Sequence, residues 1–256
     1  MVADEQKARF LQVCEDVIEQ GHAEMGIGTY GEKYMHLILK RFFCEDPDCH
    51  EVGIGDFFAD AMVDDTIYEI QTGSFYPLKK KLTYYLTRED KRVVIVCPVV
   101  VSKRLFWVDP VTGAIDGKPR RVTQGRAHMR VLREIYWLAE LLDFHRVTLR
   151  LVMLSVDEYK KLDGFGADKK KKASKIERIP RELLDIVDIT GVEGVARTFL
   201  PEGLPEVFTA AEFSALTGAK RLALSADLKA LEVLGIIGRE GKRGRASLYR
   251  LFQNKT

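Results

Sequence analysis

Apolar residues in the first hundred positions recur with the period of helices and then with the period of strands. In residues 5–19 they follow a 3.6-residue spacing, which predicts an amphipathic helix, and a second helix is predicted over residues 30–43. Pro77 opens another helical stretch, residues 78–86, because proline fits the first turn of a helix. Residues 91–101 are almost continuously apolar and β-branched, which predicts a strand buried on both faces of a sheet.

Two shorter apolar runs, residues 57–63 and 66–71, predict a β-hairpin. They flank Asp64 and Asp65, a polar pair that is typical of a tight turn. If the turn has two residues, each side chain before it faces one after it: Val63 faces Thr66, Met62 faces Ile67, Ala61 faces Tyr68, and Asp60 faces Glu69.

The pair of acidic residues in this hairpin predicts a cation site. Directly opposed residues have Cβ atoms about 4.5–5.5 Å apart, so Asp60 and Glu69 would repel each other unless a positive charge lies between them. A divalent cation with oxygen ligands satisfies both carboxylates. Gln71 projects from the same strand face as Glu69, since side chains alternate along a strand.

These residues also carry a resemblance to a known family. Asp60, followed by Glu69-Ile70-Gln71 on the next strand and by the helix over residues 78–86, resembles the motif of the PD-(D/E)XK nuclease superfamily. Residues 28–43, GTYGEKYMHLILKRFF, resemble its first core helix and carry Glu32. The resemblance covers about residues 20–100 and implies an α/β fold with the order αβββαβ, in which helices flank a mixed sheet.

The resemblance also implies roles for individual residues. Asp60 and Glu69 would bind Mg²⁺ or Mn²⁺ through their carboxylates and Ile70 through its carbonyl, while Glu32 would bind a second ion or a metal-bound water. The chain departs from the family motif at Gln71, where lysine is usual, and glutamine donates hydrogen bonds but carries no charge. Lys80, with Lys79 and Lys81 beside it on the following helix, is the candidate replacement.

The middle of the chain predicts further strands and helices. Residues 104–123 predict a hairpin with the turn Asp109-Pro110-Val111-Thr112-Gly113. Residues 126–142 predict an amphipathic helix, residues 146–154 a strand, and residues 156–162 a short helix. Residues 164–175 are polar and lysine-rich, and two interpretations stay open: a solvated surface loop, or a loop that contacts phosphates beside the active site.

The C-terminal segment, residues 203–256, has a pattern of its own. Residues 208–217 predict a short helix that begins with the capping box Thr209 and Glu212. A longer helix is predicted over residues 220–234, and two strands follow around the turn sequence EGKRGRA. Helix, turn, helix and a two-stranded wing in this order resemble the winged helix-turn-helix fold.

That second resemblance implies DNA binding, since the second helix of such folds enters the major groove and the wing meets the backbone. The residues in matching positions are Lys220, Arg221, Ser225, Lys229, Arg239, Lys242, Arg243 and Arg245. Nine Lys and Arg outnumber five Asp and Glu in the segment, so it carries +4 and the remainder −2, which favours an anionic partner. The alternative is a module for protein contacts or dimerisation.

Composition narrows the class of protein. A hydrophobic fraction of 46% and a charged fraction of 30% are typical of globular domains, and no run approaches the roughly 18 apolar residues of a membrane span. The first twenty residues are acidic and helix-like rather than a secretory signal, so a cytoplasmic protein without membrane contact is expected. Cys44, Cys49 and His50 lie close together, but their spacing matches no usual zinc pattern and a second pair is missing.

The sequence therefore predicts an α/β protein with a PD-(D/E)XK nuclease-like domain over residues 1–180 and a winged helix-turn-helix domain over residues 181–256. The expected activity is metal-dependent hydrolysis of DNA phosphodiester bonds, with the winged helix positioning the DNA. One alternative is a catalytically inactive, nuclease-like DNA-binding protein or regulator, which Gln71 favours. Another is a protein-interaction module within a larger complex. A homodimer is expected from the family resemblance alone.

Overall fold

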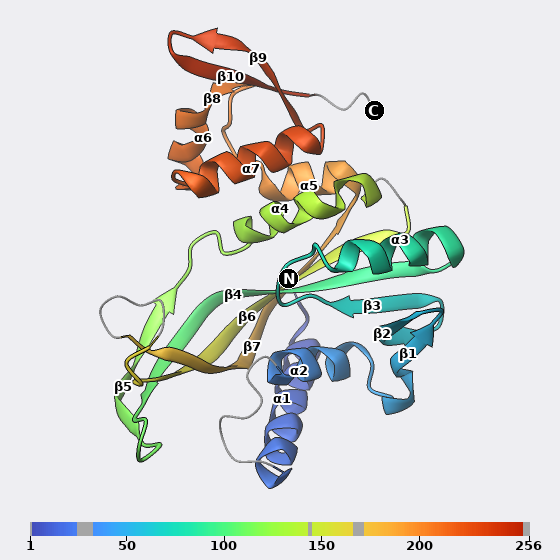
Figure 1. Ribbon diagram of the computed structural model, residues 1–256, viewed down its shortest axis with the longest axis vertical. Helices are drawn as coiled ribbons and strands as arrows, with labels where there is room; N and C mark the ends of the chain where they lie inside the picture. Colours follow the sequence, from blue (N-terminus) through green and yellow to red (C-terminus); the bar gives the residue numbers. More distant parts are fainter. Residues whose placement is uncertain (1, 25–32, 143–144, 166–171, 253–256) are drawn as a thin grey trace. The chain divides into compact units, whose positions relative to one another are not determined.

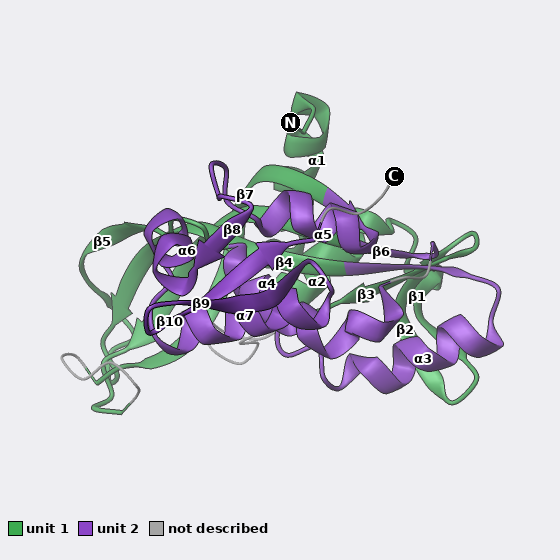
Figure 2. Ribbon diagram, turned by 90° about the horizontal axis from the view of Figure 1, so that it is seen from above, with its two compact units in different colours: residues 1–72, 96–127, 150–187 green, residues 73–95, 128–149, 188–256 purple. Residues whose placement is uncertain are grey.

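The structure, a computed structural model (Figure 1), describes residues 2–24, 33–142, 145–165 and 172–252. Its contacts divide the chain into two compact units, each assembled from three separate segments (Figure 2). The first unit contains residues 1–72, 96–127 and 150–187, and the second contains residues 73–95, 128–149 and 188–256.

Two helices at the start of the chain belong to the first unit, α1 (Asp4–Glu24) and α2 (Lys33–Phe43). Both predicted helices are confirmed, although residues 30–32, the predicted start of the second, lie outside the described residues. Phe10 and Phe42 join the helices edge to face, with ring centroids 5.2 Å apart. The apolar stripe of α1 is thus the face that packs on α2.

A mixed sheet of seven strands is flanked by helices (Figure 1). Its main path runs β1-β2-β3-β4-β6-β7, and β5 pairs with β4. The strands are β1 (His50–Ile54), β2 (Phe57–Val63), β3 (Thr66–Ile70), β4 (Arg92–Val108), β5 (Ile115–Thr123), β6 (Val147–Lys161) and β7 (Ser174–Thr190). The neighbours β3 and β4 are joined through α3 (Leu78–Arg88), the kind of helical crossover that parallel strands require.

The β2–β3 hairpin is confirmed. Its strands pair Val63 with Thr66, Met62 with Ile67 and Ala61 with Tyr68, as the two-residue turn requires. Asp64 adopts φ +50°, a left-handed conformation that aspartate tolerates better than most residues. Along the described part of the hairpin the ladder ends before the fourth predicted pair, Asp60 with Glu69.

Strand β1 is absent from the sequence prediction. It pairs antiparallel with β2 at the end of the sheet path, and Ile54 is the one position of its five that is fully buried. An edge strand with so little buried surface has no alternating apolar pattern to reveal it.

Strand β4 is longer than predicted. It does not end at residue 101 but continues to Val108 and forms the first arm of the predicted hairpin with β5. The predicted turn is confirmed, because the carboxylate of Asp109 accepts hydrogen bonds from the N–H groups of Val111 and Thr112 at 2.9 and 2.7 Å.

The short helix predicted over residues 156–162 is wrong, because β6 continues as a strand to Lys161. The charged residues there suggest an exposed helix, but Glu158 among them is buried and paired with cations across the sheet. The helix predicted over residues 126–142 divides into α4 (Met129–Ile135) and the 3₁₀ segment η2 (Tyr136–Leu141).

Strand β7 was also missed by the sequence pattern. It is rich in charged residues and contains Pro180, which is tolerated because β7 lies at the end of the sheet path. The predicted domain boundary at residues 180 and 181 falls within this strand. Most of the lysine-rich loop before it, residues 166–171, lies outside the described residues, so its phosphate-contacting interpretation stays a prediction.

The C-terminal part of the second unit contains the predicted pattern of two helices and two strands. After α5 (Gly191–Phe199), which was not predicted, the elements are β8 (Val207–Thr209), α6 (Ala210–Thr217), α7 (Leu222–Val233), β9 (Ile237–Arg243) and β10 (Ala246–Leu251). The capping box of Thr209 and Glu212 is confirmed, and Gly218 ends α6 with φ +69°. The additional strand β8 pairs with β10 to give a three-stranded sheet.

Candidate functional site

The carboxylate of Asp60 joins the two strands of the hairpin at the point where their ladder ends. Its Oδ2 accepts a hydrogen bond from the N–H of Ile70 at 2.6 Å, and its Oδ1 lies 3.2 Å from Nε2 of His36 on α2. The carboxylate is thus oriented by one backbone donor on β3 and by a contact with His36 on α2. The predicted candidate Asp60 is therefore a fixed, half-buried carboxylate.

Glu69 precedes Ile70 on β3 and is 4% exposed. Because the N–H of Ile70 is directed toward β2, its carbonyl is directed to the same edge, as in any antiparallel pair. The next residue, Gln71, donates its N–H to the carbonyl of Val96 at 2.8 Å, so the end of β3 is held against β4. Asp60, Glu69 and the Ile70 carbonyl thus lie on neighbouring positions of the hairpin.

The chemistry of these donors fits a hard divalent cation. Two carboxylates and a carbonyl are oxygen ligands, and Mg²⁺ commonly takes one or two protein carboxylates and completes its shell with water. Over the residues that the structure describes, no group of three or more His, Cys, Asp and Glu could hold a metal. The further predicted acid, Glu32, lies outside the described residues.

The helix α2 supplies two bases that the sequence reasoning did not assign. His36 and Lys40 are one helical turn apart and so share a face of α2. His36 contacts Asp60 on β2, and the buried ammonium of Lys40 forms an ion pair with Glu51 on β1. No signal along the chain singles out His36, because Asp60 lies 24 positions further on and only the fold brings the two together.

Lys80, the proposed replacement for the motif lysine, is exposed on α3 in the second unit. Its neighbour Lys79 forms an ion pair with Glu140 at 2.9 Å. The approach of Lys80 to the hairpin of the first unit stays a prediction.

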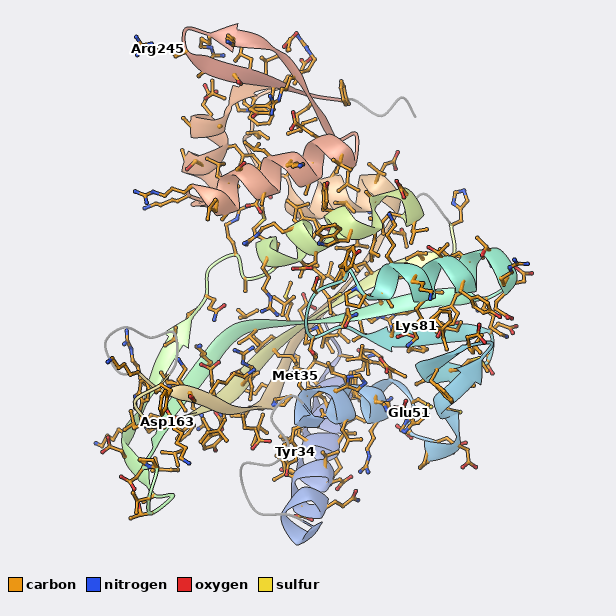
Figure 3. The ribbon with its side chains drawn as sticks, viewed as in Figure 1. Tyr34, Met35, Glu51, Lys81, Asp163 and Arg245 are labelled. Carbon is orange, nitrogen blue, oxygen red and sulfur yellow. The ribbon has the colours of Figure 1, made fainter. Side chains whose placement is uncertain are left out.

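The eight predicted DNA-contacting residues are all exposed in the second unit: Lys220, Arg221, Ser225, Lys229, Arg239, Lys242, Arg243 and Arg245. Two of them are paired with acids, Arg239 with Glu232 at 2.8 Å and Arg243 with Glu212 at 3.0 Å. Arg245 extends from the far end of the β9–β10 hairpin (Figure 3).

The buried face of helix α7 packs against α4. Asp227, which is 1% exposed, lies 3.1 Å from the guanidinium of Arg133 on α4. Lys229 is placed with its ammonium 5.6 Å from the ring centroid of Tyr136. Ser225 and Lys229 are four residues apart and exposed on one face of α7, whereas Lys220 and Arg221 precede this helix, which begins at Leu222 and not at the predicted residue 220.

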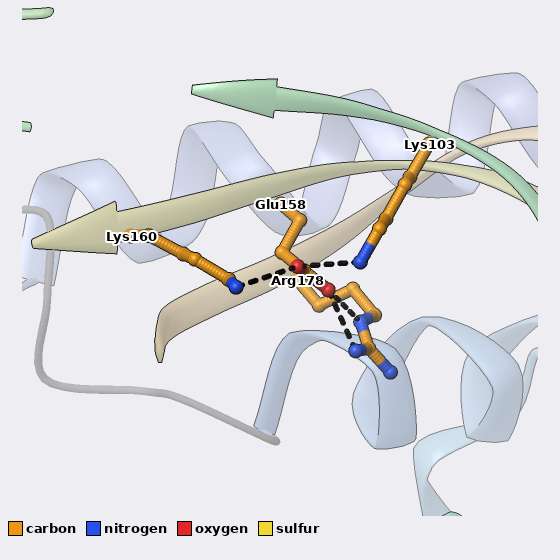
Figure 4. A network of polar contacts seen from close by, with 4 residues as sticks. All are labelled: Lys103, Glu158, Lys160 and Arg178. Carbon is orange, nitrogen blue, oxygen red and sulfur yellow. Dashed lines mark hydrogen bonds and ion pairs between the residues drawn. The ribbon is translucent and has the colours of Figure 1, made fainter. Parts of the chain in front are cut away.

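A buried ionic network crosses the first unit (Figure 4). Glu158 on β6 is bound by Lys103 of β4 at 2.7 Å and by Arg178 of β7 at 2.6 Å, with Lys160 at 4.0 Å. Burial alone would raise the pKa of Glu158, but the hydrogen bonds from Lys103 and Arg178 outweigh it and lower the pKa. The network ties three strands together, and the parallel arrows of β4 and β6 are visible in the same view.

Cys44, Cys49 and His50 lie together in one local turn, which hydrogen bonds hold in place. Nε2 of His50 lies 2.9 Å from the carbonyl of Cys44, and Sγ of Cys44 donates to the carbonyl of Asp46 at 3.4 Å. Burial and a hydrogen bond with Cys49 raise the pKa of the Cys44 thiol to about 11.

Comparison with known proteins gives a family but no activity. The chain belongs to the family described as a domain of unknown function, DUF8091, whose profile matches residues 33–190, more than half of the sequence. No curated protein and no solved structure matches it. Of the described helices, none is both long and apolar enough to cross a membrane.

Proposed function

We propose that this protein is a Mg²⁺- or Mn²⁺-dependent DNA nuclease of the PD-(D/E)XK type, with a C-terminal winged helix that positions the DNA. The observation that carries the proposal is the contact between Asp60 and the backbone of Ile70. It places an oriented carboxylate beside the buried Glu69 and beside a carbonyl on the same strand edge. These are the three oxygen ligands that the family resemblance implies.

The order of the elements supports the proposal. The chain runs α2, β1, β2, β3, α3 and β4, which is the αβββαβ order of the superfamily, and it includes a strand that the sequence pattern missed. Asp60 lies on the second strand of this series and Glu69-Ile70-Gln71 at the end of the third.

Each residue has a distinct role in the proposed site. A bound cation would polarise a phosphoryl oxygen and lower the pKa of a coordinated water. Asp60 and Glu69 would hold it, and His36 would fix the carboxylate of Asp60 through its Oδ1. Gln71 would donate hydrogen bonds to the scissile phosphate, and Lys80 would supply the positive charge that Gln71 lacks.

The exposed cations of the second unit support the DNA-binding part of the proposal. They lie on the second helix and the hairpin of a helix–helix–hairpin series that resembles a winged helix. The hairpin tip combines Lys242, Arg243 and Arg245 with two glycines, which suits contacts with phosphates. The expected homodimer stays a prediction.

A second candidate function is DNA binding without cleavage. The observation that favours it is Gln71, because a glutamine at the motif position supplies no charge to the reacting phosphate. Such a protein would bind DNA without metal and leave it intact.

Cleavage of labelled duplex, nicked and single-stranded DNA with Mg²⁺ or Mn²⁺ tests the proposal. Asp60→Asn should abolish cutting, because it keeps the hydrogen-bond acceptor but removes the charge that holds the cation. Asp64→Asn is the matched control, since it removes the same charge from the hairpin turn and asparagine tolerates the positive φ found there. Metal-independent binding with intact DNA, equal in all three proteins, would favour the second candidate.

A further inference from the structure

A cavity of about 290 Å³ lies in the first unit, among α1, α2, β5, β6 and β7. It is separate from the candidate metal site, since neither Asp60 nor Glu69 is among its described lining residues. Leu11, Ile18, Ile115 and Ile179 give it apolar walls, and Tyr34 and Tyr159 contribute aromatic rings. Pockets near this volume accommodate small molecules rather than polymers.

The lining residue Glu177 is the unusual feature of this cavity. Its side chain is 2% exposed, and its Oε1 has no hydrogen-bond partner in the part of the chain that the structure describes. A buried carboxyl group without a partner is unfavourable by several kcal/mol relative to water, so such groups are normally paired. Glu158 on the neighbouring strand β6 shows the usual solution, with cations bound to both oxygens.

Acidic residues outnumber basic ones among the described lining residues of the cavity. Glu15 of α1 and Glu177 line it together with Asp157, which is itself bound by Arg104 at 2.6 Å. Arg181 is the cation among the described lining residues, and it pairs with Glu182 at 2.5 Å. Arg181 lies four positions after Glu177 on β7, a span of about 13 Å along the strand, so the arginine does not neutralise the carboxylate.

The remaining titratable groups at the cavity do not supply a partner for Glu177. Burial raises the pKa of Cys14 to about 12, so it stays a thiol. Burial, followed by the charge of Asp157, raises the pKa of Tyr159, so it stays a phenol. Tyr34 of α2 adds a second aromatic ring to the wall.

We propose that this cavity binds a small organic cation, a primary ammonium group on an apolar body, with Glu177 as its counter-ion. The ammonium would supply the hydrogen bonds that Oε1 lacks, and charge-assisted bonds of this kind are the strongest available to a carboxylate. The rings of Tyr34 and Tyr159 would cover the apolar body and add cation–π attraction. This binding site is independent of the proposed nuclease activity.

The cation would bind the ionised form of Glu177. Burial raises the pKa of Glu177 to about 7, so below that pH the carboxyl must lose a proton before it can pair. Affinity should therefore rise about tenfold per pH unit up to pH 7 and then level off. A neutral ligand that accepts a hydrogen bond from the protonated acid would show the reverse trend.

Calorimetric titration of the full chain with benzylamine tests the proposal, with benzyl alcohol as the uncharged probe of the same shape. Benzylamine should bind saturably at pH 8, at least about tenfold more tightly than benzyl alcohol. Glu177→Gln should remove this preference, while Glu177→Asp, which keeps the charge, should retain part of it. Asp185→Asn is the control, because Asp185 lies on the same strand but is not among the described lining residues of this cavity.

Three results would overturn the proposal. They are the absence of saturable benzylamine binding at pH 8, equal binding of the two probes, and benzylamine affinity that strengthens as the pH falls. Circular dichroism melts of each variant in the same buffers distinguish loss of binding from loss of folding.

Discussion

The N–H of Ile70 donates to the carboxylate of Asp60 at 2.6 Å, across two strands whose backbone ladder has just ended. A side chain thus continues the pairing of β2 with β3 where the backbone no longer does. The same contact fixes the orientation of the Asp60 carboxylate, which is one of the two predicted metal-binding acids.

Metal binding should stabilise the folded protein. Mn²⁺ at a hundred times its dissociation constant would add about 2.7 kcal/mol to the free energy of unfolding, because it binds only the folded state. Thermal melts with and without Mn²⁺ should show this gain for the parent and for Asp64→Asn, but not for Asp60→Asn or Glu69→Gln. An equal gain in all four proteins would place the cation elsewhere.

Introducing the lysine of the PD-(D/E)XK motif should accelerate the proposed cleavage. Gln71→Lys would place a positive charge on the same strand face as Glu69, near the proposed position of the scissile phosphate, where charge stabilisation is most effective. We expect a rate increase of about tenfold or more in single-turnover assays. Gln71→Met, similar in size but uncharged, should not increase the rate. A lysine variant no faster than the parent would show that another residue already supplies the charge.

Removing two cations from the hairpin of the second unit should change how DNA affinity depends on salt. Each phosphate contact contributes about 0.9 to the slope of log affinity against log salt. The double variant Lys242→Ala/Arg245→Ala should therefore lower the slope by about 2, as measured by fluorescence anisotropy. Arg250→Ala is a suitable control, since Arg250 is already bound by Glu206 and Glu240. A slope that falls equally in the control would argue against a specific role of the hairpin tip.

The ionic network at Glu158 should make the protein sensitive to acid. Because its folded-state pKa is lowered from an ordinary value of 4.5, the stabilisation is complete above that pH and is lost as the pH falls through the folded value. Glu158→Gln should destabilise the fold by about 1.5–3 kcal/mol at pH 7, since it removes the counter-charge of Lys103 and Arg178, whose side chains are partly exposed to water. Urea denaturation at pH 7 measures this loss. A loss below about 1 kcal/mol would indicate that the two cations find other partners.

Glu177 should have the opposite effect on stability. Its pKa of about 7 exceeds the ordinary 4.5, so the unfolded state releases its proton first and stability declines as the pH rises between these values. The decline approaches about 1.4 kcal/mol per pH unit within that window. Glu177→Gln should remove it, and urea melts from pH 4.5 to 8 in the absence of amines compare the two proteins. A parallel pH profile in the variant would show that the carboxyl has another partner.

Elements with a regular local pattern could be predicted from the sequence. The stripe of α1, the turn of the β2–β3 hairpin and the capping box at Thr209 all depend on residues within a few positions of one another. The patterns failed where charged residues lie inside the protein. The charged residues around Glu158 led to the prediction of a helix where β6 continues as a strand. The many charged residues of β7 gave no apolar strand pattern, so this strand of seventeen residues was not predicted.

In the candidate site, too, residues close together in the chain could be predicted, whereas a contact between distant residues could not. Asp60, Glu69 and Gln71 could be found because they lie within twelve positions on two adjacent strands. His36 could not, because nothing in its neighbourhood along the chain indicates that α2 brings it to Asp60.

The sequence by itself determined the local elements, the acidic hairpin and the basic C-terminal segment, since all three follow from the order of neighbouring side chains. Only the tertiary structure decided that cations would surround Glu158, while Oε1 of Glu177 would line a cavity with no hydrogen-bond partner among the described residues. The two glutamates lie on adjacent strands and have the same chemistry. Their difference arises from residues distant in the chain, whose positions are set by packing that local periodicity does not encode.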